Sequence, residues 1–176
     1  MKILGHIKDR QIIYCNIRVD NNWFSQLPKS NWIAFTIADN DDKDLLNDTT
    51  IKCLDNGVNY TCSAGQLGSD TEDYFDEEIA WRETQKQETT GEPADFDKTP
   101  MTSSHKNFGE GFWFATTGAQ ATINDEYLPI DKVVCIDFTK QRVRRHLLNL
   151  IDKINNGWLP SDEEIETPFY DTQVNS

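Results

Sequence analysis

The chain has 176 residues, a net charge of −13 and 37% hydrophobic residues, including five Trp and nine Phe. A chain of this length forms one domain by default, here residues 1–176, with enough buried surface for one core. So many large apolar side chains argue against a disordered chain, and the acidity argues against a nucleic-acid partner, whose phosphates require a basic face.

The N-terminal segment, residues 1–19, has the pattern of a β-hairpin. Two short apolar strands, residues 2–7 and 11–19, flank a polar turn at residues 8–10. The segment lacks the apolar core of a signal peptide, and no stretch of the chain reaches the roughly 18 apolar residues that a membrane span needs. We therefore expect a cytoplasmic protein without a membrane partner.

Strands and helices alternate in the rest of the chain. The apolar run at residues 32–38 is nearly continuous, which is typical of a strand buried on both faces in a parallel sheet. Three more strands are expected at residues 58–64, 99–105 and 132–138. A helix is expected after each of the four strands: between residues 42 and 57, from a Ser69-x-x-Glu72 capping box to about residue 85, between residues 107 and 118, and from about residue 140 to residue 156.

This alternation predicts an α/β fold with three layers, a mostly parallel sheet of about four strands with helices on both faces. The hairpin would extend the sheet or cap one edge, residues 119–131 would form a loop, and residues 161–176 would form an acidic tail. Ligands of this fold class bind where the carboxyl ends of the strands meet the following loops. We therefore expect Asp39, Cys62 and His105 to lie on one rim of the sheet.

The four cysteines are expected to be buried thiols, because they lie in apolar segments and form no Cys-x-x-Cys pair. They are Cys15, Cys53, Cys62 and Cys135. The three histidines are scattered, so the sequence predicts no metal site. The loop at residues 62–69 joins a strand to a helix but matches no phosphate-binding motif, and we expect no cofactor.

An acidic cluster opens the second helix. Its members are Asp70, Glu72, Asp73, Asp76, Glu77 and Glu78. Asp73 and Glu77 share one helical face, where like charges destabilise a helix by a few tenths of a kcal/mol. Three interpretations stay open: a solvated helix start, an acidic face that binds a protein, and a carboxylate metal or acid–base site that includes His105.

His105 follows a Thr-Ser-Ser run at the end of a predicted strand, where a general base can lie. Ser103 and Ser104 are so close to it in sequence that we expect neither to form a nucleophile–base pair with it. Cys62 is the better nucleophile if neighbouring strands bring it to His105. The aromatic run at residues 108–114 is expected in the core, although part of it could instead anchor a partner.

Four short motifs resemble those of an uncharacterised bacterial domain family. They are Cys-x-x-Gly at Cys62 to Gly65, Glu72-Asp73 with Asp76-Glu77, Met101-Thr102 with His105, and Trp113-Phe114. The resemblance covers about residues 30–140 and implies an α/β fold with a shared rim, but it brings no established activity.

The leading hypothesis is an acidic interaction protein, most concretely an immunity or inhibitor protein that neutralises a basic toxin enzyme. Its partner-binding residues would be Asp70, Glu72, Asp73, Asp76, Glu77, Trp81 and Trp113. The alternative is a small hydrolase or transferase at the strand-end rim. There Cys62 or a metal-bound water would attack, and His105 would move protons. Glu72 or Asp73 would orient His105 or hold a divalent ion.

Overall fold

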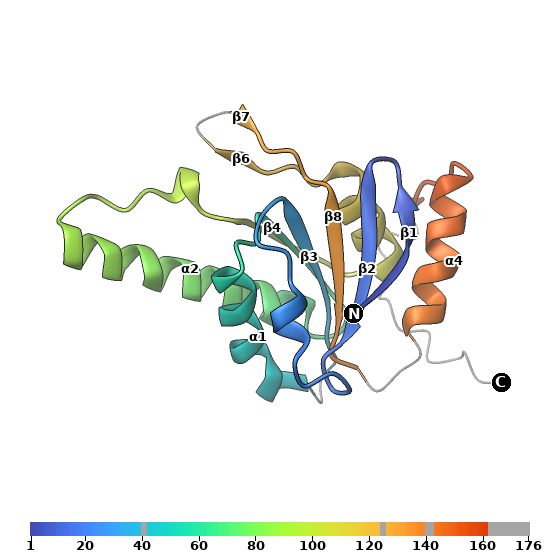
Figure 1. Ribbon diagram of the computed structural model, residues 1–176, viewed down its shortest axis with the longest axis horizontal. Coiled ribbons are helices and arrows are strands. Elements are labelled where there is room, and N and C mark those ends of the chain that lie inside the picture. Colours follow the sequence, from blue (N-terminus) through green and yellow to red (C-terminus); the bar gives the residue numbers. More distant parts are fainter. Residues whose placement is uncertain (40–41, 124–125, 140–142, 162–176) are drawn as a thin grey trace.

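The apolar run that begins at Trp32 forms strand β3 (Trp32–Ile37), and all six of its residues are buried. Side chains of a strand alternate between the two faces of a sheet, so a strand without a polar face must be covered on both sides. In this computed structural model, the described residues are 1–39, 42–123, 126–139 and 143–161 (Figure 1).

The main sheet has six strands. In chain order they are β1 (Lys2–Ile7), β2 (Arg10–Asn16), β3, β4 (Tyr60–Ala64), β5 (Met101–His105) and β8 (Lys132–Asp137). Their spatial order is β1-β2-β8-β3-β4-β5, and every neighbouring pair is parallel except the antiparallel pair of β1 and β2. The four strands that the sequence predicts are therefore adjacent and parallel. The sheet has six strands rather than about four because β2 pairs with β8 and carries β1 with it, so that the hairpin extends the sheet.

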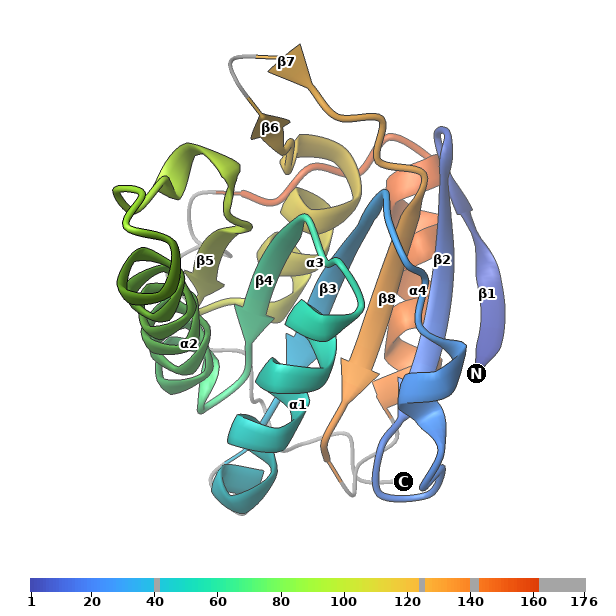
Figure 2. The ribbon, with the colours of Figure 1, turned by 60° about the vertical axis from the view of Figure 1, so that its left-hand side comes forward.

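Helices cover both faces of this sheet. They are α1 (Lys43–Asp55), α2 (Gly68–Thr90), α3 (Phe108–Trp113) and α4 (Val143–Asn155), with short 3-10 turns η1 (Trp23–Gln26) and η3 (Phe96–Lys98) and a π-helical segment η4 (Phe114–Gly118). Helices α1 and α2 lie on one face, and α3 and α4 lie on the other (Figure 2). The chain runs from β3 through β4 to β5 and then returns to β8 on the far side of β3. Right-handed crossovers in opposite directions place their helices on opposite faces.

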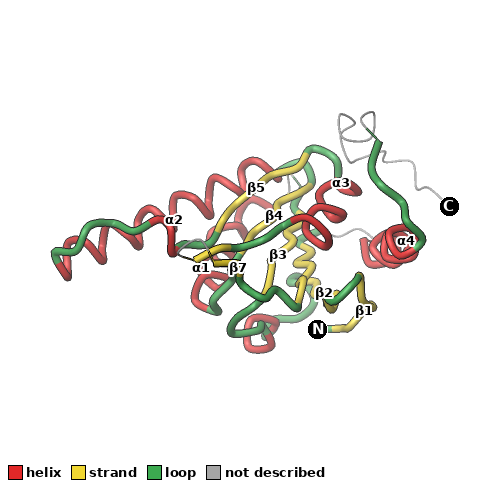
Figure 3. Tube along the Cα trace, turned by 90° about the horizontal axis from the view of Figure 1, so that it is seen from above, coloured by secondary structure: helices red, strands yellow, loops and turns green. Residues whose placement is uncertain are grey.

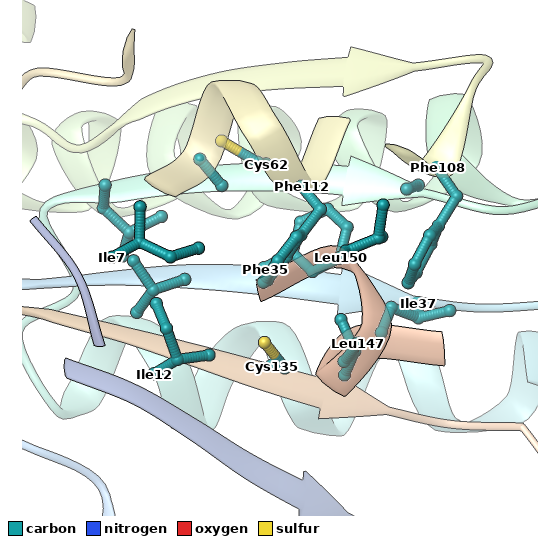
Figure 4. Packing of buried hydrophobic residues seen from close by; sticks show 14 of the residues in the cluster. Ile7, Ile12, Phe35, Ile37, Cys62, Phe108, Phe112, Cys135, Leu147 and Leu150 are labelled. Atoms are coloured by element: carbon teal, nitrogen blue, oxygen red, sulfur yellow. The ribbon is translucent and has the colours of Figure 1, made fainter. Parts of the chain in front are cut away.

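Two hydrophobic clusters fill the space between the sheet and its helices. On the α3–α4 face, the ring of Phe35 lies 5.3 Å from that of Phe108 and 5.5 Å from that of Phe112. Leu147 and Leu150 of α4 complete this contact (Figure 4). The cluster on the α1–α2 face includes Trp32, Leu46, Phe75 and Phe138. Both faces of the central strands are thereby sealed from water.

The second helix differs from the prediction at both ends. No side chain caps it at Leu67, and Ser69 already lies inside its first turn, so the predicted capping box does not form. The helix also continues past residue 85 to Thr90 and ends at Gly91, whose φ of 76° is in the left-handed region.

The segments around the third and fourth helices add further differences. Helix α3 continues into η4, and the expected loop after it contains the short antiparallel strands β6 (Thr122–Ile123) and β7 (Glu126–Tyr127). Residues 140–142, at the predicted start of the last helix, and residues 162–176 of the predicted acidic tail lie outside the described residues. In the part of the chain that the structure describes, no helix combines the length and apolar character needed to cross a bilayer.

Candidate functional site

The carboxyl ends of the five parallel strands form one row across the sheet. In register, this row consists of Asn16, Asp137, Ile37, Ala64 and His105. Neighbouring strands lie about 4.8 Å apart, so His105 and Asp137, which are three strand spacings apart, are separated by roughly 14 Å. The row therefore carries two separate polar clusters rather than the single convergent site that the sequence suggests.

The Asp137 cluster is satisfied internally. Its Oδ2 accepts hydrogen bonds from the Tyr14 hydroxyl at 2.6 Å and from Asn16 Nδ2 at 3.0 Å. Its Oδ1 accepts two more from the backbone N–H and the hydroxyl of Thr139, both at 2.8 Å. Burial raises the pKa of Asp137, although these hydrogen bonds act in the opposite direction. The four donors use the lone pairs of the carboxylate, so this cluster joins β2 to β8 and does not present a ligand site.

At the other end of the row, His105 lies between two polar partners. Its Nε2 is 3.2 Å from Ser103 Oγ, and its Nδ1 is 2.6 Å from Glu110 Oε2. With a proton on Nδ1, the ring donates to Glu110, and its Nε2 is an acceptor for the Ser103 hydroxyl, whose other acceptor is the Thr61 carbonyl oxygen at 3.4 Å. The side chains of His105 and Glu110 are only 10% and 16% exposed, so bulk water screens this contact little. These three groups form a hydroxyl–imidazole–carboxylate relay.

The local sequence positions this relay. Ser103 and His105 are two residues apart in a strand, so both project to the α3 face. Asn107 caps α3 by accepting the backbone N–H of Glu110 at 3.0 Å, which sets the first turn of that helix against the end of β5. Gly111 permits the close approach, because a Cβ there would lie 2.8 Å from the Cβ of His105.

Ser103 lies within hydrogen-bond distance of His105, although its closeness in sequence argues against such a contact. The strand period of two brings side chains i and i+2 to the same face. Ser104 points to the opposite face and donates a hydrogen bond to Glu72 of α2. Glu110 is absent from the predicted site residues, although the signal was available: an Asn three residues before a Glu, directly after the strand, is the pattern of a helix start.

Cys62 lies within β4 rather than at its end, opposite Ser103 of β5, and it is fully buried on the α3 face (Figure 4). Burial raises the pKa of the Cys62 thiol to about 12, although an interaction with the Ser103 hydroxyl acts in the opposite direction. A thiol with this pKa is protonated at neutral pH and is a poor nucleophile. The other cysteines are also buried free thiols, as predicted: Cys15, Cys53 and Cys135.

One face of α2 turns its acidic residues toward β5. Glu72 accepts a hydrogen bond from Ser104, and Asp76 accepts one from Thr102 at 2.7 Å. These two carboxylates therefore attach the helix to the edge strand. They lie on the opposite side of β5 from the imidazole of His105, and the carboxylate that contacts His105 is Glu110.

The opposite face of α2 points away from the sheet. The buried residues Thr71, Phe75 and Ile79 define the inward face, and helical spacing places Asp70, Asp73, Glu77 and Trp81 on the outward one. We call these four residues the outer face of α2. Asp70 forms an ion pair with Lys43 at 3.4 Å, whereas no ion pair among the described residues includes Asp73 or Glu77.

The two predicted aromatic anchors lie on different surfaces. Trp81 is 58% exposed, one turn beyond Glu77. Trp113 is half-buried on α3, where it packs against the core cluster on the other face of the sheet. Trp81 therefore belongs to the outer face of α2, and Trp113 does not.

Helix α2 extends well beyond the sheet (Figures 1 and 3). Its 23 residues span about 35 Å. Its last buried residue is Ile79, and none of the residues from Ala80 to Thr90 is buried. The following loop turns back beside the helix and is tied to it by a hydrogen bond from the Asp95 backbone N–H to Glu83 at 3.0 Å. The helix is thus anchored at one end and projects at the other.

The larger hollow that the structure describes lies away from the row of strand ends. A hollow of about 300 Å³, lined by Ile79, Arg82, Lys98 and Pro100 among others, lies at the amino ends of β4 and β5. Within the described ranges, no group of three or more His, Cys, Asp and Glu side chains is arranged to hold a metal ion.

A family model described as a domain of unknown function (DUF7684) matches residues 12–154, and the chain belongs to this family. The match spans the sheet from β2 to β8 and includes both α2 and His105, which confirms the resemblance to an uncharacterised domain family. No curated protein and no solved structure matches the chain.

Proposed function

We propose that this protein is an acidic interaction protein of the cytoplasm, most concretely an immunity or inhibitor protein that neutralises a basic toxin enzyme. The observation that carries the proposal is the outer face of α2, where three carboxylates are followed by an exposed indole. The face combines two carboxylates without an ion-pair partner among the described residues, Asp73 and Glu77, with an apolar anchor and a support that packs on the sheet.

The charge of the protein is concentrated on α2. This helix holds eight acidic and two basic residues, so its net charge of −6 is nearly half of the −13 of the whole chain. Asp73 and Glu77 repel each other by a few tenths of a kcal/mol, and no ion pair of the described residues relieves them. A basic partner would supply the missing countercharge, and complementary charge would also speed association and fix orientation.

Trp81 supplies the apolar part of the surface. The residue is 58% exposed. Burying a large apolar side chain completely stabilises a protein or a complex by about 1.5–3 kcal/mol, so much of this free energy is still available for binding. Tryptophan is among the residues that most often dominate binding energy at protein interfaces. A partner pocket that takes up this indole beside basic residues would recover that free energy.

The support of the outer face is rigid. Thr71, Phe75 and Ile79 hold the first part of α2 on the sheet, and the hydrogen bonds of Glu72 and Asp76 hold its side against β5. A preformed helix loses little conformational freedom on binding, so more of the contact energy appears as affinity.

The test compares two double variants that change the net charge equally. Asp73→Lys/Glu77→Lys reverses charge on the outer face, and Asp9→Lys/Asp152→Lys reverses two exposed charges near β1 and α4, on the other side of the sheet. Four proteins are immobilised as baits: the wild type, the two double variants and Trp81→Ala. Each is exposed to an extract of the native organism at about 50 mM salt.

We expect one basic protein that the wild type and the Asp9/Asp152 control retain, and that the other two baits lose. Its Kd for the wild type should rise at least about tenfold when the salt is raised to about 500 mM. A captured toxin enzyme should lose its activity at a one-to-one ratio. Capture of no protein, equal capture by all four baits, or binding that ignores salt would refute the proposal.

The alternative, a small hydrolase or transferase, is favoured by one observation, the hydrogen-bonded His105 at the end of β5. The protonated, buried Cys62 does not suit the role of its nucleophile. Such an activity would need a different attacking group in contact with the imidazole.

A further inference from the structure

We infer that Ser103, His105 and Glu110 form a site, separate from the outer face of α2, that hydrolyses small carboxylic esters with Ser103 as the nucleophile. The Ser103 hydroxyl lies 3.2 Å from His105 Nε2, and His105 Nδ1 lies 2.6 Å from the Glu110 carboxylate. Through such contacts an imidazole takes a proton from a hydroxyl while a carboxylate holds the ring in the required tautomer. A relay of this kind is recognised by geometry and roles rather than by order in the sequence.

The reaction has two steps. In the first, Ser103 Oγ forms a bond to the ester carbonyl carbon and its proton passes to His105 Nε2. The bond to the alcohol then breaks, and the alcohol leaves with the proton from His105. In the second, water attacks the acyl-serine and gives a proton to His105, which returns it to Ser103 Oγ as the carboxylic acid departs. Ester and water thus become acid and alcohol, and no oxidant or cofactor is consumed.

Aromatic side chains border the relay. The ring of Phe114 lies 5.0 Å from that of His105 and 6.0 Å from that of Tyr60. Burial raises the pKa of the Tyr60 phenol, although an interaction with the Ser103 hydroxyl acts in the opposite direction. A tyrosine hydroxyl is one of the donors that stabilise a developing oxyanion. The aromatic wall suits a short apolar acyl group.

The position of β5 provides the approach to the relay. Within the described residues, β5 is the outermost strand of the sheet on this side, so no neighbouring strand closes off its outer edge. The side chains of His105 and Glu110 are 10% and 16% exposed, and Ser103 is partly exposed, so only a small molecule could reach all three groups. This access fits small esters and excludes folded protein substrates.

The experiment treats the full chain with a fluorophosphonate, which forms a phosphonyl ester with an activated serine and releases fluoride. Mass spectrometry locates the adduct. We expect a single adduct on Ser103 that is absent in Ser103→Ala and that forms at least about 100-fold more slowly in His105→Gln. In Glu110→Gln the rate should fall at least about tenfold. Ser104→Ala is the matched control, since this neighbouring hydroxyl faces α2, and it should keep the wild-type rate.

Hydrolysis of p-nitrophenyl acetate provides a second readout, and thermal unfolding establishes that each variant is folded. The rate should fall at least about 100-fold in His105→Gln. Asp73→Lys/Glu77→Lys should label at the wild-type rate, so failure of the binding proposal would leave this result intact. The inference is overturned if the folded wild type forms no adduct, if the adduct lies on another residue, or if His105→Gln labels as fast as the wild type.

Discussion

Helix α3 approaches the edge strand β5 closely at Gly111, and this contact can be tested by adding one methyl group. A Cβ at Gly111 would lie 2.8 Å from His105 Cβ and 3.1 Å from His105 Cγ. Atoms at these distances must move, and overpacking of this kind costs about 1–3 kcal/mol. Replacing glycine by alanine in a helix stabilises the helix by roughly 1 kcal/mol, because alanine has the higher helix propensity. The free energy of unfolding of Gly111→Ala should therefore be about 0–2 kcal/mol lower than that of the wild type.

Gly109→Ala is the matched control, because it lies in the same helix and brings a similar gain in helix propensity. Its Cβ would lie 3.3 Å from Asn107 Oδ1 and 3.4 Å from Trp158 Cη2, both at the ends of side chains. We expect Gly111→Ala to be less stable than Gly109→Ala by about 2 kcal/mol, which is roughly 4–8 °C in Tm for a domain of this size.

Urea unfolding measures the difference as a shift in midpoint at constant slope. The displaced imidazole should also slow fluorophosphonate labelling of Ser103 at least about tenfold in Gly111→Ala and not in Gly109→Ala. Equal stability of the two variants would show that α3 does not press on His105, and the argument for a precisely held relay would fail with it.

Two further predictions concern buried carboxylates. Because burial raises the pKa of Asp137, the folded state holds its proton more tightly than the unfolded state, so this group lowers stability as pH rises above its ordinary pKa of 3.8. The Tm of the wild type should therefore fall relative to that of Asp137→Asn from about pH 4 to pH 7. A wild-type Tm that rises relative to that of the variant over this range would contradict the sign. Arg18 is the ion-pair partner of Asp42, whose side chain is only 2% exposed. Arg18→Ala should cost about 3–5 kcal/mol in urea unfolding at neutral pH, and a loss below about 1 kcal/mol would mean that water reaches Asp42.

The order of strands was only partly predictable. The continuous apolar pattern of β3 and its alternation with helices indicate parallel strands buried on both faces, and the sheet contains them. The parallel pairing of β2 with β8 joins segments more than a hundred residues apart. Local periodicity carries no information on such a pairing, because it depends on which edge of the sheet is free once the rest has formed.

The candidate site was also predictable only in part. Its place at a strand end identifies His105 from the sequence, whereas the sequence pattern argues against Ser103 and does not single out Glu110. The alternation of strand side chains would have recovered Ser103. Glu110 reaches His105 only because Gly111 lets α3 settle against β5, and that approach depends on packing.

The acidic helix was evident from composition, whereas its division into two faces was not. Charge counting cannot separate Glu72 and Asp76, which bond to β5, from Asp73 and Glu77, which face away. Only the docking of α2 on the sheet makes that distinction.

By itself, the sequence determined the class of fold, the burial of the cysteines and the acidity of α2, because these follow from hydrophobic period and charge along short segments. The tertiary structure alone decided how many strands join the sheet, which carboxylate meets His105 and which side of α2 is exposed, because each depends on contacts between segments that only packing brings together.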